Sequence, residues 1–297
     1  MKFVVTGSAG NVSKPLTQFL LQAGHQVSVV TRKADNVADL VKQGAVAAVG
    51  NMEDVAFLTE TFKGADGVYL MLPPMWDSAD QKKQSIQYAE HFKTAITSTG
   101  VKNVVFLSSY GAHRHTDAGP ISGMGLAENV LNTLSTDVNV LSLRTGYFYS
   151  NLLLSIDLIK EAGHMGNMFD IPQGTFTVVD PEDIARTAAA ALATQNFKGH
   201  SYVYVVSDLT GTDEIASLIG KEIGIPGLKW EKFEAENFRQ VLLGYGFAKG
   251  AANDYVEMFD TLDKGLLFEH FFEVNASFGG TSIEAFAKRF AAIYKKR

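Results

Sequence analysis

The sequence predicts a doubly wound α/β fold, in which a parallel sheet is covered by helices on both faces. Over about the first 145 residues, short runs of mostly β-branched and other apolar residues alternate with longer segments of helical periodicity. The runs are nearly continuously apolar, which is typical of strands that are buried on both faces. The segments between them are long enough for right-handed helical crossovers, which connect parallel strands.

Six strands are predicted in this part of the chain, each from an apolar or β-branched run. They cover residues 3–5, 27–30, 45–49, 68–72, 104–107 and 140–143. The helices predicted between them cover residues 11–23, 36–42, 55–62, 80–98 and 126–134. In the first helix, Leu16, Phe19 and Leu20 share one face, as expected for a helix that lies on a sheet. The helix at 55–62 follows Asp54, a favoured N-cap residue.

The pattern changes after Arg144. We predict a first domain over residues 1–150 and a smaller, mostly helical region over residues 151–297, with a later return strand to the sheet within 175–206. Pro181 and the two acidic residues after it suit the first turn of a helix. The helices predicted in this part cover residues 152–160, 181–193, 213–223, 234–243, 251–262 and 282–294, and the strands cover 175–179 and 203–206.

The composition indicates a globular protein, because 46% of the 297 residues are hydrophobic and 20% are charged. A net charge of −6 provides no basic surface for a phosphate backbone, so no nucleic-acid partner is expected. The absence of cysteine excludes disulfides, thiolate nucleophiles and cysteine-bound metals. Thr6 and Gly7 interrupt the first apolar run, and no run of 18 apolar residues occurs. We therefore expect a cytoplasmic monomer or homodimer without a signal peptide or membrane span.

A glycine-containing turn follows the first strand, where residues 6–13 read TGSAGNVS. Gly7 and Gly10 allow the backbone to turn sharply and approach a phosphate, and the following helix offers free N–H groups and a positive dipole. Ser13 replaces the third glycine of the usual pattern and is also small. The turn predicts binding of a dinucleotide diphosphate, and a tight turn without a ligand is the alternative. The expected contacts are Thr6, Gly7, Ala9, Gly10, Asn11 and Val12.

The residues that follow the next strands predict the rest of the cofactor site. Arg32 and Lys33 end the second strand, where a cationic pair favours the 2′-phosphate of NADP(H) over the free hydroxyl of NAD(H). Two solvated surface charges are the alternative. The other expected contacts are Asn51 and Met52 at the adenine, Leu72 and Pro73 beside the ribose, and Ser108 after the fifth strand.

In this order, the motifs resemble those of the NmrA-like family, an atypical branch of the short-chain dehydrogenases/reductases. The matching segments are residues 5–10, 31–32, 50–54, 108–112, 126–128 and 178–185. The resemblance implies a Rossmann-like fold and NADP(H) binding. It also implies one of two functions: an NAD(P)H-dependent reductase of quinones or related small molecules, or a protein that binds NADP(H) only as a redox sensor and regulator.

The resemblance also shows that the catalytic pattern is incomplete. Short-chain reductases use a Tyr-x-x-x-Lys pair, and if Glu128 is the family's helix glutamate, these positions hold Pro120 and Met124, which cannot donate a proton. We therefore expect hydride transfer to an electron-poor acceptor such as a quinone, whose reduced anion takes its proton from water. The non-catalytic regulator is the alternative. Gly123 and Gly125 either leave room for a ligand or loosen the turn.

A quinone-like acceptor needs an apolar, aromatic pocket, so the expected partner is a small hydrophobic or aromatic substrate. Tyr110 and Tyr147 are the candidate catalytic donors to its oxygen. The expected pocket residues are Met75, Trp76, Tyr110, Tyr147, Phe148 and Met165. These side chains could instead fill the core, which is the favoured interpretation for Phe148 and Tyr149. We expect no metal, because the histidines within 113–115 lack further ligands nearby.

Overall fold

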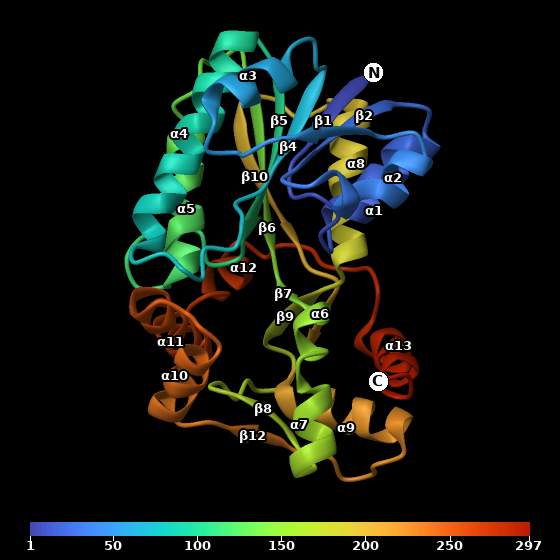
Figure 1. Cartoon of the computed structure of the whole chain (residues 1–297). Helices are drawn as coiled ribbons and strands as arrows, with labels where there is room; N and C mark the ends of the chain where they lie inside the picture. The colour runs from blue at the N-terminus through green and yellow to red at the C-terminus, as the bar shows by residue number, and fades with distance from the viewer.

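The computed structural model describes all 297 residues and contains a seven-stranded parallel sheet in the order β10-β6-β5-β4-β1-β2-β3 (Figure 1). The strands are β1 (Lys2–Val5), β2 (Gln26–Thr31), β3 (Val46–Val49), β4 (Gly67–Leu70), β5 (Asn103–Ser109), β6 (Asn139–Thr145) and β10 (His200–Val205). The winding direction reverses between β1 and β4, which opens a crevice at the carboxyl ends of these strands. The predicted doubly wound fold is confirmed.

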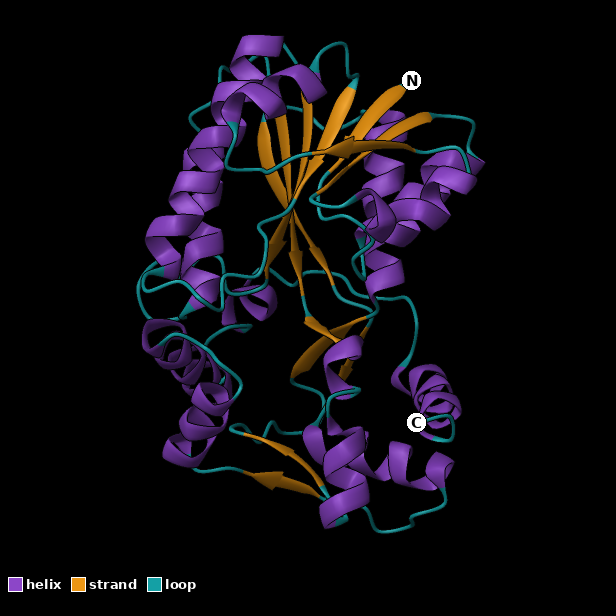
Figure 2. Cartoon of the chain, in the orientation of Figure 1, coloured by secondary structure: helices purple, strands orange, loops and turns teal.

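Helices cover both faces of this sheet (Figure 2). One layer is formed by α3 (Val55–Phe62), α4 (Gln81–Thr99) and α5 (Pro120–Leu131). The other layer is formed by α1 (Ser13–Gln22), the short helices η1 (Ala34–Val37) and α2 (Ala38–Lys42), and α8 (Pro181–Thr194). In β1, Val4 packs into the core under the first layer, whereas Phe3 and Val5 pack under the second. Burial on both faces explains why the central strands are mostly apolar.

Helix α5 begins at Pro120, six residues before the predicted start. Its two glycines serve close packing instead of either predicted role. A Cβ at Gly123 would lie 2.5 Å from the Ser85 Oγ of α4, and a Cβ at Gly125 would lie 2.1 Å from the Ala112 carbonyl oxygen. The glycines therefore allow α5 to contact α4 and the preceding loop directly, which offsets their low helix propensity.

Two small sheets and several helices form the remaining region, which lies beyond the carboxyl ends of the long strands (Figure 1). One sheet has the order β11-β9-β7, from β7 (Tyr147–Phe148), β9 (Phe176–Val179) and β11 (Asp208–Thr210), and the other pairs β8 (Met165–Asn167) with β12 (Trp230–Lys232). The helices are α6 (Tyr149–Leu152), α7 (Ser155–Ala162), α9 (Thr212–Ile223), α10 (Ala235–Gly244), α11 (Lys249–Asp263), α12 (Glu269–Glu273) and α13 (Ile283–Tyr294). Of the two strands predicted within 175–206, β10 pairs with β6 in the main sheet, whereas β9 belongs to the small sheet.

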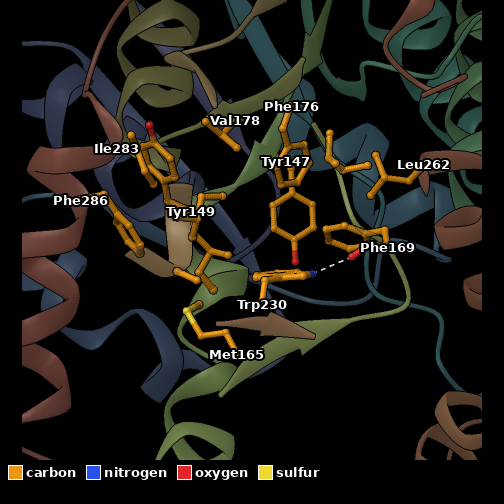
Figure 3. Packing of buried hydrophobic residues seen from close by; sticks show 14 of the residues in the cluster. Tyr147, Tyr149, Met165, Phe169, Phe176, Val178, Trp230, Leu262, Ile283 and Phe286 are labelled. Atoms are coloured by element: carbon orange, nitrogen blue, oxygen red, sulfur yellow. Dashed lines mark hydrogen bonds between the residues drawn. The ribbon is translucent and has the colours of Figure 1, made fainter. Parts of the chain in front are cut away.

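An aromatic cluster forms the core of this region (Figure 3). The Phe169 ring lies 5.5 Å from the rings of both Phe176 and Trp230 and 5.4 Å from that of Phe259. The Trp230 indole N–H donates to the Phe169 carbonyl oxygen at 2.7 Å. These contacts join β9, β12 and α11 around one buried ring.

None of the helices has the length and apolar composition that crossing a bilayer requires.

Two aspartates at the start of α8 attach the C-terminal segment to the sheet. Asp180 caps α8 and pairs with Arg289 of α13. Asp183 accepts hydrogen bonds from the Ser207 hydroxyl at 2.6 Å and from the Thr281 backbone N–H at 2.8 Å. The acidic residues of segment 178–185 therefore have an architectural role.

Candidate functional site

A cleft of about 640 Å³ surrounds the turn that follows β1. It lies at the reversal of strand order, where ligands bind in open α/β sheets. Its lining consists of Gly7, Ser8, Ala9, Gly10, Asn11, Val12, Ser13, Asn36, Met71, Pro74, Leu107 and Phe148. The cleft thus contains five of the six residues that the sequence predicts for the diphosphate contact.

The turn is held in a shape that requires glycine at position 7. Gly7 has a φ of 93°, and a Cβ there would lie 2.5 Å from the Ser13 Oγ and 2.8 Å from the Met71 Cγ. The Ser13 hydroxyl donates to the Thr6 carbonyl oxygen at 2.8 Å. The Ser8 hydroxyl is hydrogen-bonded to that of Thr31 at 3.0 Å. The serine that replaces the third glycine therefore fastens the start of α1 to the end of β1.

The N-terminus of α1 faces this cleft with unpaired donors. The backbone N–H groups of Asn11, Val12 and Ser13 have no acceptor within the chain, and no side chain caps the helix. Free N–H groups and the helix dipole together attract an anion. Gly7 and Gly10 line the cleft and carry no side chain, so a ligand can approach the backbone at this point. The residues present therefore fit the diphosphate of a dinucleotide.

The end of β2 provides free cations beside the cleft. Arg32 and Lys33 are exposed, and neither forms an ion pair. Asn51 is also exposed and donates a hydrogen bond to Glu53, whereas Met52 packs partly against the core under α3 and α4. Unpaired guanidinium and ammonium groups at this edge suit a phosphate on the ribose of a dinucleotide.

In the segment after β4, the residues that line the cleft differ from those that the sequence predicts. Leu72 and Met75 are buried in the core under α3 and α4, and Pro73 does not line the cleft, whereas Met71 and Pro74 do. The alternation of β4 explains this difference, because Leu72 continues the face of Leu70 whereas Met71 points to the opposite face. The alternation along β4 therefore predicts that Met71, and not Leu72, faces the cleft.

A buried ion pair involves Glu128 of α5, four residues after Met124. The Arg144 guanidinium donates to Glu128 twice, from Nε to Oε1 at 3.1 Å and from Nη2 to Oε2 at 2.7 Å. The Ser108 hydroxyl donates to the same Oε1. All three side chains are buried, so the predicted cofactor contact Ser108 has its hydroxyl committed to Glu128. The sequence analysis did not identify Arg144 as the partner of Glu128. A charged residue within a mostly apolar strand was the available sign of a buried ion pair.

The two candidate tyrosine donors both lie in the aromatic cluster. Burial raises the pKa of Tyr110 and that of Tyr147, and the neighbouring Tyr147 adds to the rise at Tyr110. The two phenols are therefore near one another and stay protonated. Figure 3 shows the Tyr147 hydroxyl directed toward Trp230. A protonated phenol can donate a hydrogen bond to a substrate oxygen, but it is a weak acid here.

The other predicted pocket residues lie in different surroundings. Tyr149 fills the core, since its ring stacks on Phe286 at 4.7 Å and its hydroxyl donates to the Thr281 carbonyl oxygen at 3.0 Å. Phe148 is half-buried and lines the cleft, contrary to the favoured core interpretation. Met165 is completely buried in the aromatic cluster, and Trp76 is 51% exposed.

The predicted histidine pair does not converge on one site. His113 stacks on His270 at 5.2 Å and contacts the Glu269 carboxylate at 3.3 Å, whereas His115 lies near Asn129. No three His, Asp or Glu side chains are arranged to hold a metal ion.

Comparison with known proteins gives a consistent result. The model described as the NmrA-like family matches residues 1–289. An NAD(P)H azoreductase of Xenophilus azovorans is 23% identical over 256 residues, covering 86% of this chain and 85% of that protein. The structure of an NADPH-dependent quinone oxidoreductase from Escherichia coli with NADPH has a TM-score of 0.78 at 17% identity, covering 97% of this chain and 99% of that one. A Citrobacter sp. triphenylmethane reductase with NADP(H) has a TM-score of 0.77 at 18% identity, with the same coverage.

Proposed function

Because the chain belongs to the NmrA-like family, we propose that it is an NAD(P)H-dependent reductase that transfers hydride to a small, electron-poor aromatic acceptor such as a quinone. The observation that carries the proposal is the cleft, where unpaired N–H groups of α1 lie over a glycine turn beside the free Arg32. The relatives named above reduce azo compounds, quinones and triphenylmethane dyes, according to their names. These compounds are conjugated acceptors.

Bound NADPH would supply hydride from its nicotinamide. The N–H groups of Asn11, Val12 and Ser13 would bind the diphosphate, and Arg32 would bind the 2′-phosphate. Phe148 would exclude water from the cleft that it lines. The contribution of the chain is therefore to position the two reactants and keep the reacting faces dry.

The available side chains favour an acceptor that needs no general acid. Reduction of an ordinary ketone creates a strongly basic alkoxide, which a Tyr-Lys pair normally protonates. Pro120 and Met124 provide no such pair, and the buried Tyr110 and Tyr147 hold their protons. A quinone yields a delocalised, weakly basic anion that takes a proton from water. Tyr110 and Tyr147 are buried in the aromatic cluster and do not line the cleft, so the reduction would take no proton from them.

Turnover of conjugated acceptors tests this function. We expect the purified protein to oxidise NADPH, followed by its absorbance, with at least one acceptor from a panel of quinones, azo dyes and triphenylmethane dyes. An aliphatic ketone is the matched control and should give no turnover. NADPH binding in a calorimetric titration without turnover of any acceptor would contradict the reductase and favour the non-catalytic regulator.

Arg32→Ala tests the preferred cofactor. We expect about tenfold weaker NADPH binding, since loss of one charge-assisted contact at an exposed site costs about 1.4 kcal/mol. NADH binding should change by less than about twofold, because NADH lacks the 2′-phosphate. Calorimetric titration of both cofactors checks this, with Lys63→Ala at the distant end of α3 as the control. Equal losses for both cofactors would show that Arg32 supports the loop instead of binding the phosphate.

A further inference from the structure

A carboxylate occupies the same edge of the sheet as Arg32. β2 and β3 pair in parallel with Thr31 opposite Val49, and the Gly50 N–H donates to the Thr31 carbonyl oxygen at 2.9 Å. The segments that follow these strands therefore leave the sheet side by side. A tight turn, closed by a 3.0 Å bond from the Asp54 N–H to the Asn51 carbonyl oxygen, presents Glu53 next to the segment of Arg32.

Both oxygens of Glu53 are held in place although the residue is exposed. The Tyr88 hydroxyl donates to Oε1 at 2.9 Å, and the Asn51 amide donates to Oε2 at 3.2 Å. Tyr88 belongs to α4 and is only 7% exposed, so its ring is anchored in the core. No lysine or arginine pairs with Glu53. The structure thus fixes an uncompensated negative charge at the sheet edge.

The β2–β3 register brings the Arg32 segment beside this carboxylate, and both charges act on the Tyr88 hydroxyl. Burial raises the pKa of Tyr88 to about 12, the hydrogen bond to Glu53 adds to the rise, and the positive charge of Arg32 opposes it. Arg32 and Glu53 therefore act on the same hydroxyl, although they form no ion pair with each other. A phosphate bound by Arg32 would enter the field of the Glu53 carboxylate.

We propose that Glu53, positioned by Tyr88, is a specificity-determining residue that lowers the preference for NADPH over NADH. The proposal rests on the proposed function, because it requires a dinucleotide in the cleft. The 2′-phosphate carries up to two negative charges, and the fixed carboxylate repels them while Arg32 and Lys33 attract them. NADH has no charge at this position, so Glu53 leaves its affinity unchanged. The hydrogen bond from Tyr88 holds the Glu53 carboxylate in place. Without this bond, the carboxylate would rotate away from the phosphate.

Glu53→Gln tests the proposal, since glutamine keeps an oxygen for the Tyr88 hydroxyl and removes the charge, together with the acceptor for the Asn51 amide. We expect the ratio of the NADH Kd to the NADPH Kd to rise about threefold at low salt, and by less at 0.5 M salt, where screening is strong. Tyr88→Phe should shift the ratio in the same direction by a smaller factor. Glu60→Gln removes an equal charge at the far end of α3 and should leave the ratio unchanged.

Calorimetric titration gives both dissociation constants without turnover. An unchanged ratio in Glu53→Gln overturns the proposal. Equal changes for both cofactors also overturn it, because they would mean that Glu53 contacts a part that both dinucleotides share. If the unmodified protein binds neither cofactor, the proposed function itself fails. Binding with an unaltered ratio refutes only the role of Glu53.

Discussion

Replacing Gly7 with alanine is expected to weaken NADPH binding at least tenfold while the chain still folds. The φ of 93° at this residue costs about 1–2 kcal/mol for any residue with a Cβ. The new Cβ would also lie 2.5 Å from the Ser13 Oγ, whose hydrogen bond to Thr6 fastens α1 to β1. Relief of this clash moves the turn, and the free N–H groups of α1 then lose their alignment with the diphosphate. A tenfold loss of affinity corresponds to about 1.4 kcal/mol. The backbone strain at residue 7 is of this size, so it is large enough to produce the expected loss.

Gly24→Ala is the matched control for this substitution. Gly24 also has a positive φ, of 79°, but a Cβ there would meet nothing within 4 Å, and it lies at the other end of α1. Both variants should lower the thermal unfolding temperature, and only Gly7→Ala should lower NADPH affinity in a calorimetric titration. Equal loss of affinity in the two variants would mean that general destabilisation, not the shape of the turn, controls binding.

The sequence was informative where one local pattern decides the structure. Apolar runs identified all seven strands of the main sheet, because burial on both faces of the central strands favours apolar residues in their interiors. The glycine turn was located because only a few residue types permit its backbone shape. Arg32 and Lys33 were found because they directly follow the second strand, where the ribose of a dinucleotide binds in such folds. Their preference for NADP(H) remains a prediction.

The sequence was less informative where contacts between distant segments determine the structure. The start of α5 was missed because Gly123 and Gly125 lower local helix propensity, and only contact with Ser85 and Ala112 explains them. Phe148 was predicted as a pocket residue with the core favoured, because an aromatic residue in a Tyr-Phe-Tyr run carries no sign of which face it occupies. Glu53 was passed over, since its partner Tyr88 comes 35 residues later on another element. Side-chain partners across elements are not encoded in local spacing.

Replacing Glu128 with alanine is expected to destabilise the fold by about 3–5 kcal/mol, the cost of removing one partner from a buried ion pair. Glu128 is 4% exposed and accepts from Arg144 twice and from Ser108 once. After its loss, the Arg144 guanidinium stays buried against the Tyr202 ring at 4.0 Å, without a carboxylate. The free energy of unfolding therefore falls mainly through an uncompensated charge. The thermal unfolding temperature should drop by on the order of 10 °C.

A combined variant separates this structural role from a catalytic one. Ser108→Ala, Glu128→Leu and Arg144→Met together remove every member of the network and fill the space with apolar groups. Stability should then recover to within about 2 kcal/mol of the unmodified protein, because burying such an ion pair gains little over apolar packing. Circular dichroism melts measure both variants, and NADPH titration below the unfolding transition should show unchanged affinity. If Glu128→Ala instead kept its unfolding temperature and lost only turnover, Glu128 would belong to the reaction, and the buried pair would be a secondary feature.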